Sequence, residues 1–67
     1  MEDKLKTVMV MGTEKPVIFM VVIADLDEHG QAADISEMIG TYPLDLANIR
    51  AQQLGKEMGF PVVLHPM

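Results

Sequence analysis

Asp25, Asp27 and His29 form the pattern in this chain that comes closest to a chemical site. The two aspartates stand two residues apart, and Glu28, His29 and Gly30 complete the segment. Carboxylate oxygens at alternate positions can point at one cation, and a neutral imidazole can serve as a further ligand. One interpretation of the segment is therefore weak binding of Ca²⁺ or Mg²⁺ by Asp25, Asp27 and His29.

The twelve-residue calcium loop gives this interpretation a stricter form because its ligand positions are fixed. Counted from Asp25, Gly30 falls at the sixth position, where such a loop has its glycine. The twelfth residue is Ser36, however, and Glu37 comes one residue too late for the bidentate carboxylate. The segment matches only the opening of a calcium loop, so an acidic polar loop at the end of a strand is the simpler interpretation.

The excess negative charge of the chain lies in residues 25–37. The formal net charge is −5, and this segment has five acidic residues and no Lys or Arg, while the acids elsewhere are balanced by basic residues. A surface of this sign disfavours direct binding to nucleic acid and suits a basic protein partner. The residues expected to contact such a partner are Glu28, Asp34, Glu37 and Tyr42.

Catalysis is not predicted by any group of residues. The chain has no cysteine, its serine and threonines belong to no nucleophile motif, and nothing in the spacing shows that His29 and His65 meet. We therefore expect a protein that is not an enzyme and that has no catalytic residues and no cofactor, other than the Ca²⁺ or Mg²⁺ considered above. The alternative is a minimal oligomeric enzyme whose site forms between protomers.

Residues 17–24 are the most informative structural element. They are eight apolar residues in a row, whereas a strand with one wet face alternates apolar and polar residues. The run therefore predicts a strand that is buried on both faces. Residues 5–11 read as a preceding strand and residues 12–15 as a short turn, so the two strands form an antiparallel hairpin that ends near Ala24.

The second half of the chain contains one clear helix. Residues 43–58 place Leu44, Ala47, Ala51, Leu54 and Met58 on one apolar stripe, with Asn48 and the charged residues on the wetter side. Gly59 is expected to end this helix, and residues 61–65 then form a strand that Pro61 assigns to a sheet edge. Between hairpin and helix, Ile35, Met38 and Ile39 have helical spacing, which predicts a short helix or a structured loop over residues 31–40.

These elements define a single small α+β domain spanning residues 1–67. We expect a three-stranded sheet in the chain order strand, strand, helix, strand (ββαβ), with the last strand parallel to the second and antiparallel to the first. Either of the first two strands can lie in the centre, and the length and apolarity of residues 17–24 favour the second. One helix covers only one face of this sheet, so a second copy is expected on the other, most simply in a dimer. No segment is long enough for a membrane helix. The predicted function is a cytoplasmic interaction or regulatory domain that self-associates through its apolar sheet.

Overall fold

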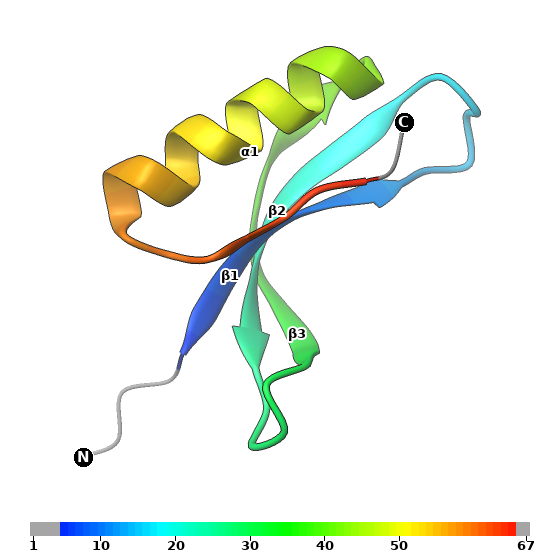
Figure 1. Cartoon of the computed structure of the whole chain (residues 1–67). Helices are drawn as coiled ribbons and strands as arrows, with labels where there is room; N and C mark the ends of the chain where they lie inside the picture. Colours follow the sequence, from blue (N-terminus) through cyan, green and yellow to red (C-terminus); the bar gives the residue numbers. More distant parts are fainter. Residues whose placement is uncertain (1–4, 66–67) are drawn as a thin grey trace.

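The computed structural model describes residues 5–65, which form one mixed sheet and one helix (Figure 1). The strands are β1 (Lys6–Gly12), β2 (Phe19–Leu26), β3 (Ala32–Tyr42) and β4 (Val62–Val63), and the helix is α1 (Leu44–Met58). The order across the sheet is β3-β2-β1-β4. The α+β class predicted from the sequence is therefore confirmed, but the sheet has four strands.

The β1–β2 hairpin has the predicted antiparallel pairing. Val8 lies opposite Ile23 and Val10 opposite Val21, and residues that lie opposite each other across a sheet share a face. These four side chains form the core with Ala47, Ala51 and Leu54 of α1. The small alanines allow the helix to lie close to the sheet, and no element formed by residues 5–65 covers the opposite face (Figure 1).

The helix ends as its glycine predicts. Gly59 has a φ of 74°, a left-handed conformation that suits a residue without a side chain. The backbone N–H groups of Gly59 and Phe60 both donate to the carbonyl of Gly55, which satisfies the end of the helix. At the other end, Pro43 directly precedes the helix and its carbonyl accepts the N–H of Ala47.

The prediction of a short helix or loop over residues 31–40 is wrong, because these residues belong to strand β3. The register between β2 and β3 shifts at three places, so that Ala24, Val22 and Met20 face Ile35, Met38 and Thr41. Extra residues of this kind, as at β-bulges, give the strand a repeat of three residues instead of two. The spacing of Ile35 and Met38 therefore imitates the period of a helix.

The predicted direction of the last strand needs a related correction. Residues 61–65 were expected to run antiparallel to the first strand, whereas β4 lies beside β1 and parallel to it. The reason is that β3 reverses the chain once more, so the crossover through α1 begins one strand further along. The edge position expected from Pro61 is confirmed. No helix in the described part of the chain is long and apolar enough to cross a membrane.

Candidate interaction surface

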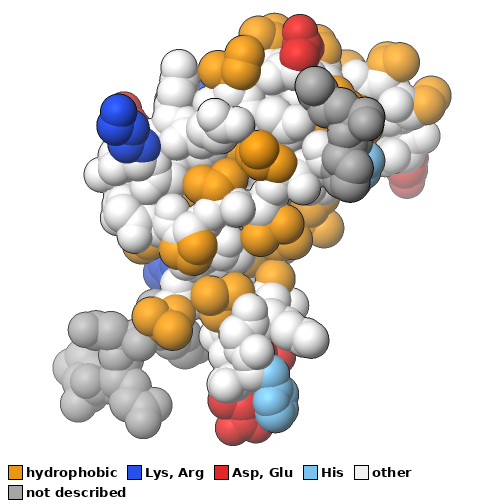
Figure 2. All heavy atoms as spheres, viewed as in Figure 1, with side chains coloured by type: hydrophobic (Ala, Val, Ile, Leu, Met, Phe, Trp, Pro, Cys, Tyr) orange, Lys and Arg blue, Asp and Glu red, His pale blue; other side chains and the backbone are white. Residues whose placement is uncertain are grey.

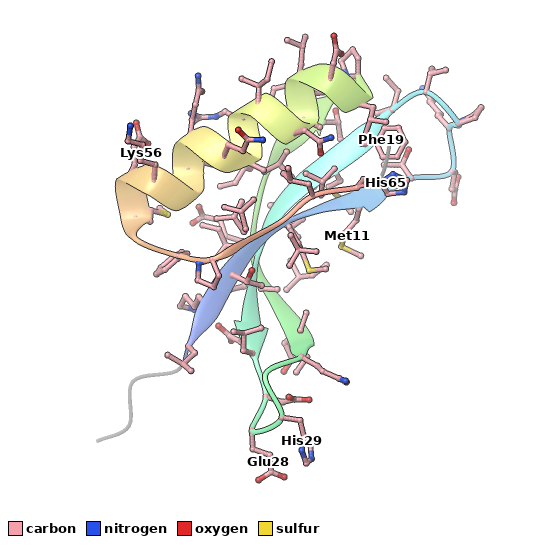
Figure 3. All side chains as sticks on the ribbon, in the orientation of Figure 1. Met11, Phe19, Glu28, His29, Lys56 and His65 are labelled. Atoms are coloured by element: carbon pink, nitrogen blue, oxygen red, sulfur yellow. The ribbon has the colours of Figure 1, made fainter. Side chains whose placement is uncertain are left out.

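The face of the sheet opposite α1 is apolar across all four strands, and we call it the open face. The register that turns Val8 and Val21 toward the helix turns their neighbours in sequence away from it. Figure 3 shows Met11 on the side of the sheet away from α1. The apolar residues of the open face are Met9, Met11, Met20, Val22, Ala24, Leu26, Ala32, Ile35, Met38 and Val63, and Thr7 and Thr41 lie on the same face.

The open face is not flat, because its centre lies lower than its flanks. Val22 and Ala24 of the inner strand β2 are 0% and 1% exposed, whereas Ile35 and Met38 of β3 are 53% and 61% exposed. A groove of about 270 Å³ lies between the flanks. Its lining residues are Met9, Met11, Ala24, Ala32, Ala33, Asp34 and Ile35. Methionine side chains are flexible and polarizable, so they adapt to apolar partners of different shape.

The acidic residues lie mainly where the β2–β3 hairpin extends beyond the helix, in a region that we call the acidic arm (residues 25–37; Figure 1). Glu28 and His29 form a largely exposed pair at the tip, with 3.7 Å between Oε1 and Nε2. Figure 2 shows acidic and histidine side chains together at this tip. Asp34 and Glu37 are exposed on β3. The arm thus presents several carboxylates to solvent.

The two aspartates of the predicted cation site have different structural roles. The Lys6 ammonium lies 2.6 Å from Oδ1 of Asp25 and also donates to Ser36. Oδ1 of Asp27 accepts the backbone N–H groups of His29 and Gln31, which closes the hairpin turn. Among residues 5–65, no three His, Asp or Glu side chains are close enough together to hold a metal ion. The cation site remains a prediction from the sequence.

Tyr42 lies at the end of β3, on the same face of the sheet as Phe19 and α1. It is partly buried, and its ring covers Gly40: a Cβ atom added to Gly40 would lie 3.0 Å from the Tyr42 hydroxyl oxygen. This glycine therefore provides the space in which the aromatic ring packs. The position gives Tyr42 a packing role, and its predicted contact with a partner stays untested.

The two histidines lie at opposite ends of the molecule (Figure 3). His29 is at the tip of the acidic arm, whereas the ring of His65 packs against Phe19 with 4.7 Å between ring centroids. The structure therefore does not bring these imidazoles together.

Asn48 is a structural residue that the sequence interpretation placed wrongly. It was expected on the wet side of the helix, but it is buried between α1 and the chain after β4. Its amide group donates to the carbonyl of His65 and accepts the N–H of His65, as a neighbouring strand would. A polar residue next to Ala47 and one turn before Ala51, within the apolar stripe, was the available signal.

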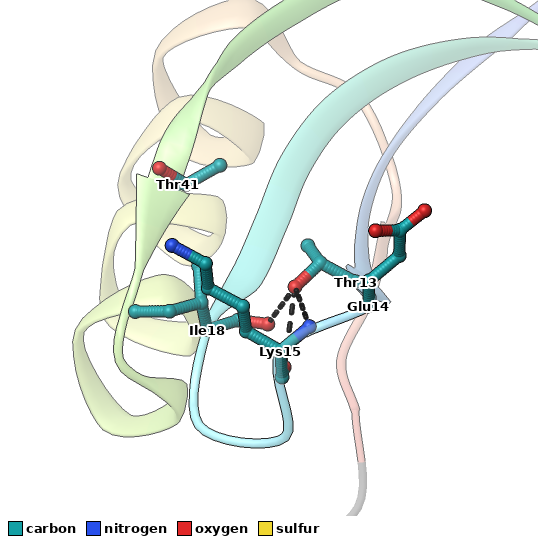
Figure 4. Close-up of a pocket in the computed structure, with 5 residues that line it drawn as sticks. All are labelled: Thr13, Glu14, Lys15, Ile18 and Thr41. Atoms are coloured by element: carbon teal, nitrogen blue, oxygen red, sulfur yellow. Dashed lines mark hydrogen bonds between the residues drawn. The ribbon is translucent and has the colours of Figure 1, made fainter.

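A second hollow of about 350 Å³ lies at the β1–β2 turn, lined by Thr13, Glu14, Lys15, Ile18 and Thr41 (Figure 4). Here the Thr13 hydroxyl donates to the carbonyl of Ile18 at 2.8 Å and accepts the N–H of Lys15 at 3.2 Å. The Thr13 hydroxyl is therefore already hydrogen-bonded within the turn that it stabilises. The hollow is wide open to solvent, so the open face of the sheet is the stronger candidate surface.

Comparisons with known proteins identify no relative of this chain. No family model matches it, and no curated protein or solved structure is significantly similar to it. The surfaces described above therefore carry the information about function.

Proposed function

We propose that this protein is a small, non-enzymatic interaction domain that self-associates through its open face and offers its acidic arm to a basic protein partner. The observation that supports the proposal is the contrast between the two faces of one sheet. One face is covered by α1, and the other presents Met9, Met11, Met20, Ile35 and Met38 with no covering element among the described residues.

The size of the open face is sufficient for association. Strands about 4.8 Å apart and about seven residues long give this sheet a face of roughly 400 Å². Burying that area on two copies at about 25 cal/mol per Å² stabilises the pair by at most about 20 kcal/mol. The loss of translational and rotational freedom costs about 4–15 kcal/mol. The balance favours association that is moderate in strength and reversible.

The acidic arm supplies the second part of the proposed function. Lys6 neutralises Asp25, but Glu28, Asp34 and Glu37 remain exposed in a region without Lys or Arg. Carboxylates of one sign on a projecting hairpin attract a positively charged partner and accelerate the encounter with it. The tip of the arm, with Glu28, lies outside the groove of the open face, so a partner can reach it while the open face is occupied.

Sedimentation of the wild-type protein and of two glutamate variants tests self-association. Met38→Glu places a charge on the open face, whereas Leu46→Glu places the same charge on the half-exposed outer side of α1 as a matched control. We expect a dimer for the wild type and for Leu46→Glu at tens of micromolar, and a monomer for Met38→Glu. A wild-type protein that remains monomeric at this concentration contradicts the proposal.

A further inference from the structure

We infer that the self-associated form is a two-fold symmetric dimer in which each copy inserts Ile35 and Met38 into the groove of the other. The inference rests on the proposed function and specifies the contact by which it occurs. We call Ile35 and Met38 the ridge. Each groove is then completed by two side chains of the partner copy.

The relief of the open face places ridge and groove side by side. Met38 lies opposite Val22, and Ile35 lies opposite Ala24, so each exposed ridge residue borders a fully buried residue of β2. On the other side of β2, Met9 lies opposite the same Val22. Across the sheet, the protruding Met38 on β3 and Met9 on β1 therefore stand on either side of the buried Val22 on β2. A copy rotated by a half turn and displaced by one strand can place its ridge over this centre.

The volumes of ridge and groove agree. A cavity of about 150 Å³ accommodates a benzene molecule. By that measure, the groove of about 270 Å³ has space for two aliphatic side chains of the size of Ile35 and Met38. The flexible Met9 and Met11 at its border can adjust to their shape. The ridge is therefore large enough to fill the groove of a second copy.

A contact between two flat faces would be smaller than a standard interface. The roughly 400 Å² available per copy is about half of the ~800 Å² that each partner buries in a standard interface. Insertion of a ridge adds the sides of the protruding side chains and the walls of the groove to the buried surface. Use of the relief therefore enlarges the contact beyond what two flat faces supply.

The edges of the sheet offer a less favourable route to dimerisation. β4 has only two residues and follows Pro61, which has no N–H group to donate. β3 is longer, but its three register shifts interrupt the regular row of N–H and C=O groups that a new strand needs. A two-fold contact between faces also closes on itself, so it yields a dimer and not a filament.

Disulfide crosslinking tests the contact, because the natural chain contains no cysteine. Met9 and Met38 lie on either side of Val22, two strand spacings or about 9.6 Å apart, which exceeds the ~7 Å limit for a disulfide. The variant Met9→Cys/Met38→Cys therefore cannot form this bond within one copy. In the proposed dimer, Cys at position 9 of one copy meets Cys at position 38 of the other.

The matched control is Met9→Cys/Ile49→Cys, which keeps the groove cysteine and moves the second one to the half-exposed outer side of α1. In a glutathione redox buffer, we expect at least roughly tenfold more covalent dimer from the first variant, because association raises the effective thiol concentration. Each single variant should form much less. Non-reducing electrophoresis and mass spectrometry of the linked peptides give the result.

The outcomes separate this inference from the proposed function. If the wild type sediments as a dimer but the 9/38 variant crosslinks no better than the control, the ridge-in-groove contact is wrong and self-association stands. If the 9/49 control crosslinks preferentially, the open face instead packs on the helix of the next copy. If the wild type is a monomer, both proposals fail.

Discussion

The replacement of Gly55 by alanine is a stringent probe of how closely α1 approaches β4. An added Cβ atom would lie 2.1 Å from Cγ2 of Val62 and 3.0 Å from the carbonyl oxygen of Phe60. Ordinary contacts between carbon atoms begin at about 3.5 Å, so the first distance is about 1.4 Å too short. Either the Val62 side chain or the helix has to move.

Two opposing effects determine the sign of the change in stability. Alanine is favoured over glycine inside a helix by about 1 kcal/mol. Overpacking of this kind costs about 1–3 kcal/mol, and here the carbonyl of Gly55 also accepts the two hydrogen bonds that end the helix. We expect Gly55→Ala to lower the free energy of unfolding by about 1 kcal/mol. In a domain of this size, this corresponds to a melting temperature lowered by roughly 5 °C.

The free energies of unfolding of four proteins, measured with denaturant, isolate the contact between positions 55 and 62. The set consists of the wild type, Gly55→Ala, Val62→Ala and the double variant. Because Val62→Ala removes the clashing Cγ2 atom, the double variant should be more stable than the sum of the single effects predicts, by about 1–2 kcal/mol. Gln52→Gly and Gln52→Ala, at an exposed position of the same helix, measure the intrinsic preference without any contact.

The result that refutes this reasoning is a stabilising Gly55→Ala variant. If alanine at position 55 gains as much over glycine as it does at position 52, then α1 and β4 are not in close contact. An absence of coupling between positions 55 and 62 would lead to the same conclusion.

Two further predictions concern the acidic arm. Glu28→Gln/Glu37→Gln should weaken binding to a lysine-rich peptide several-fold at low salt, whereas Glu14→Gln/Glu57→Gln, which removes the same number of charges elsewhere, should change it much less, since long-range attraction follows the local charge. Equal loss in both variants would show that only net charge matters. Addition of millimolar Ca²⁺ or Mg²⁺ should leave the amide chemical shifts of residues 25–37 unchanged, because Asp25 and Asp27 already have partners in Lys6 and the turn. Saturable changes confined to this segment would instead support the cation site.

Much of the fold is readable from local patterns. The continuous apolar run of residues 17–24 predicts an inner strand, but β2 begins and ends two residues later, at Phe19 and Leu26, and Val17 is 70% exposed in the preceding turn. The stripe from Leu44 to Leu54 with Gly59 predicts the helix and its end. These signals are reliable because each depends on residues close in sequence. They also predict that one face of the sheet stays uncovered, because a single helix can cover only one of its two faces.

The remaining part of the fold depends on pairings between distant residues. β3 has a three-residue repeat because extra residues interrupt its pairing with β2, and no single-strand periodicity describes such a strand. Once β3 is taken for a helix or loop, the direction of the chain entering α1 is wrong, and so is the direction of β4 relative to β1. A single error of element type thus changes the topology.

The open face, too, is predictable from the sequence only in part, because its residues are visible there but their arrangement is not. Its methionines at positions 9, 11, 20 and 38 are visible in the sequence, but their common face depends on the register of three strands. Gly55 offered a local signal, since a lone glycine inside a helical pattern often has a packing reason. Asp27 shows the opposite case, where a residue suited to cation binding is used by the backbone of a turn.

The pairing of β4 with β1 has a consequence for the order in which the chain folds during synthesis. The Thr7 hydroxyl donates to the carbonyl of Pro61 across a separation of 54 residues, nearly the full length of the chain. The β1–β2–β3 meander can form on the ribosome as soon as its residues emerge, because its contacts are local. The edge of β1 stays open until residues 61–65 are free to reach it. Until then, the nascent chain presents the unpaired edge of β1 to other chains. The pairing of β4 with β1 is therefore the folding step before which aggregation through this edge is possible.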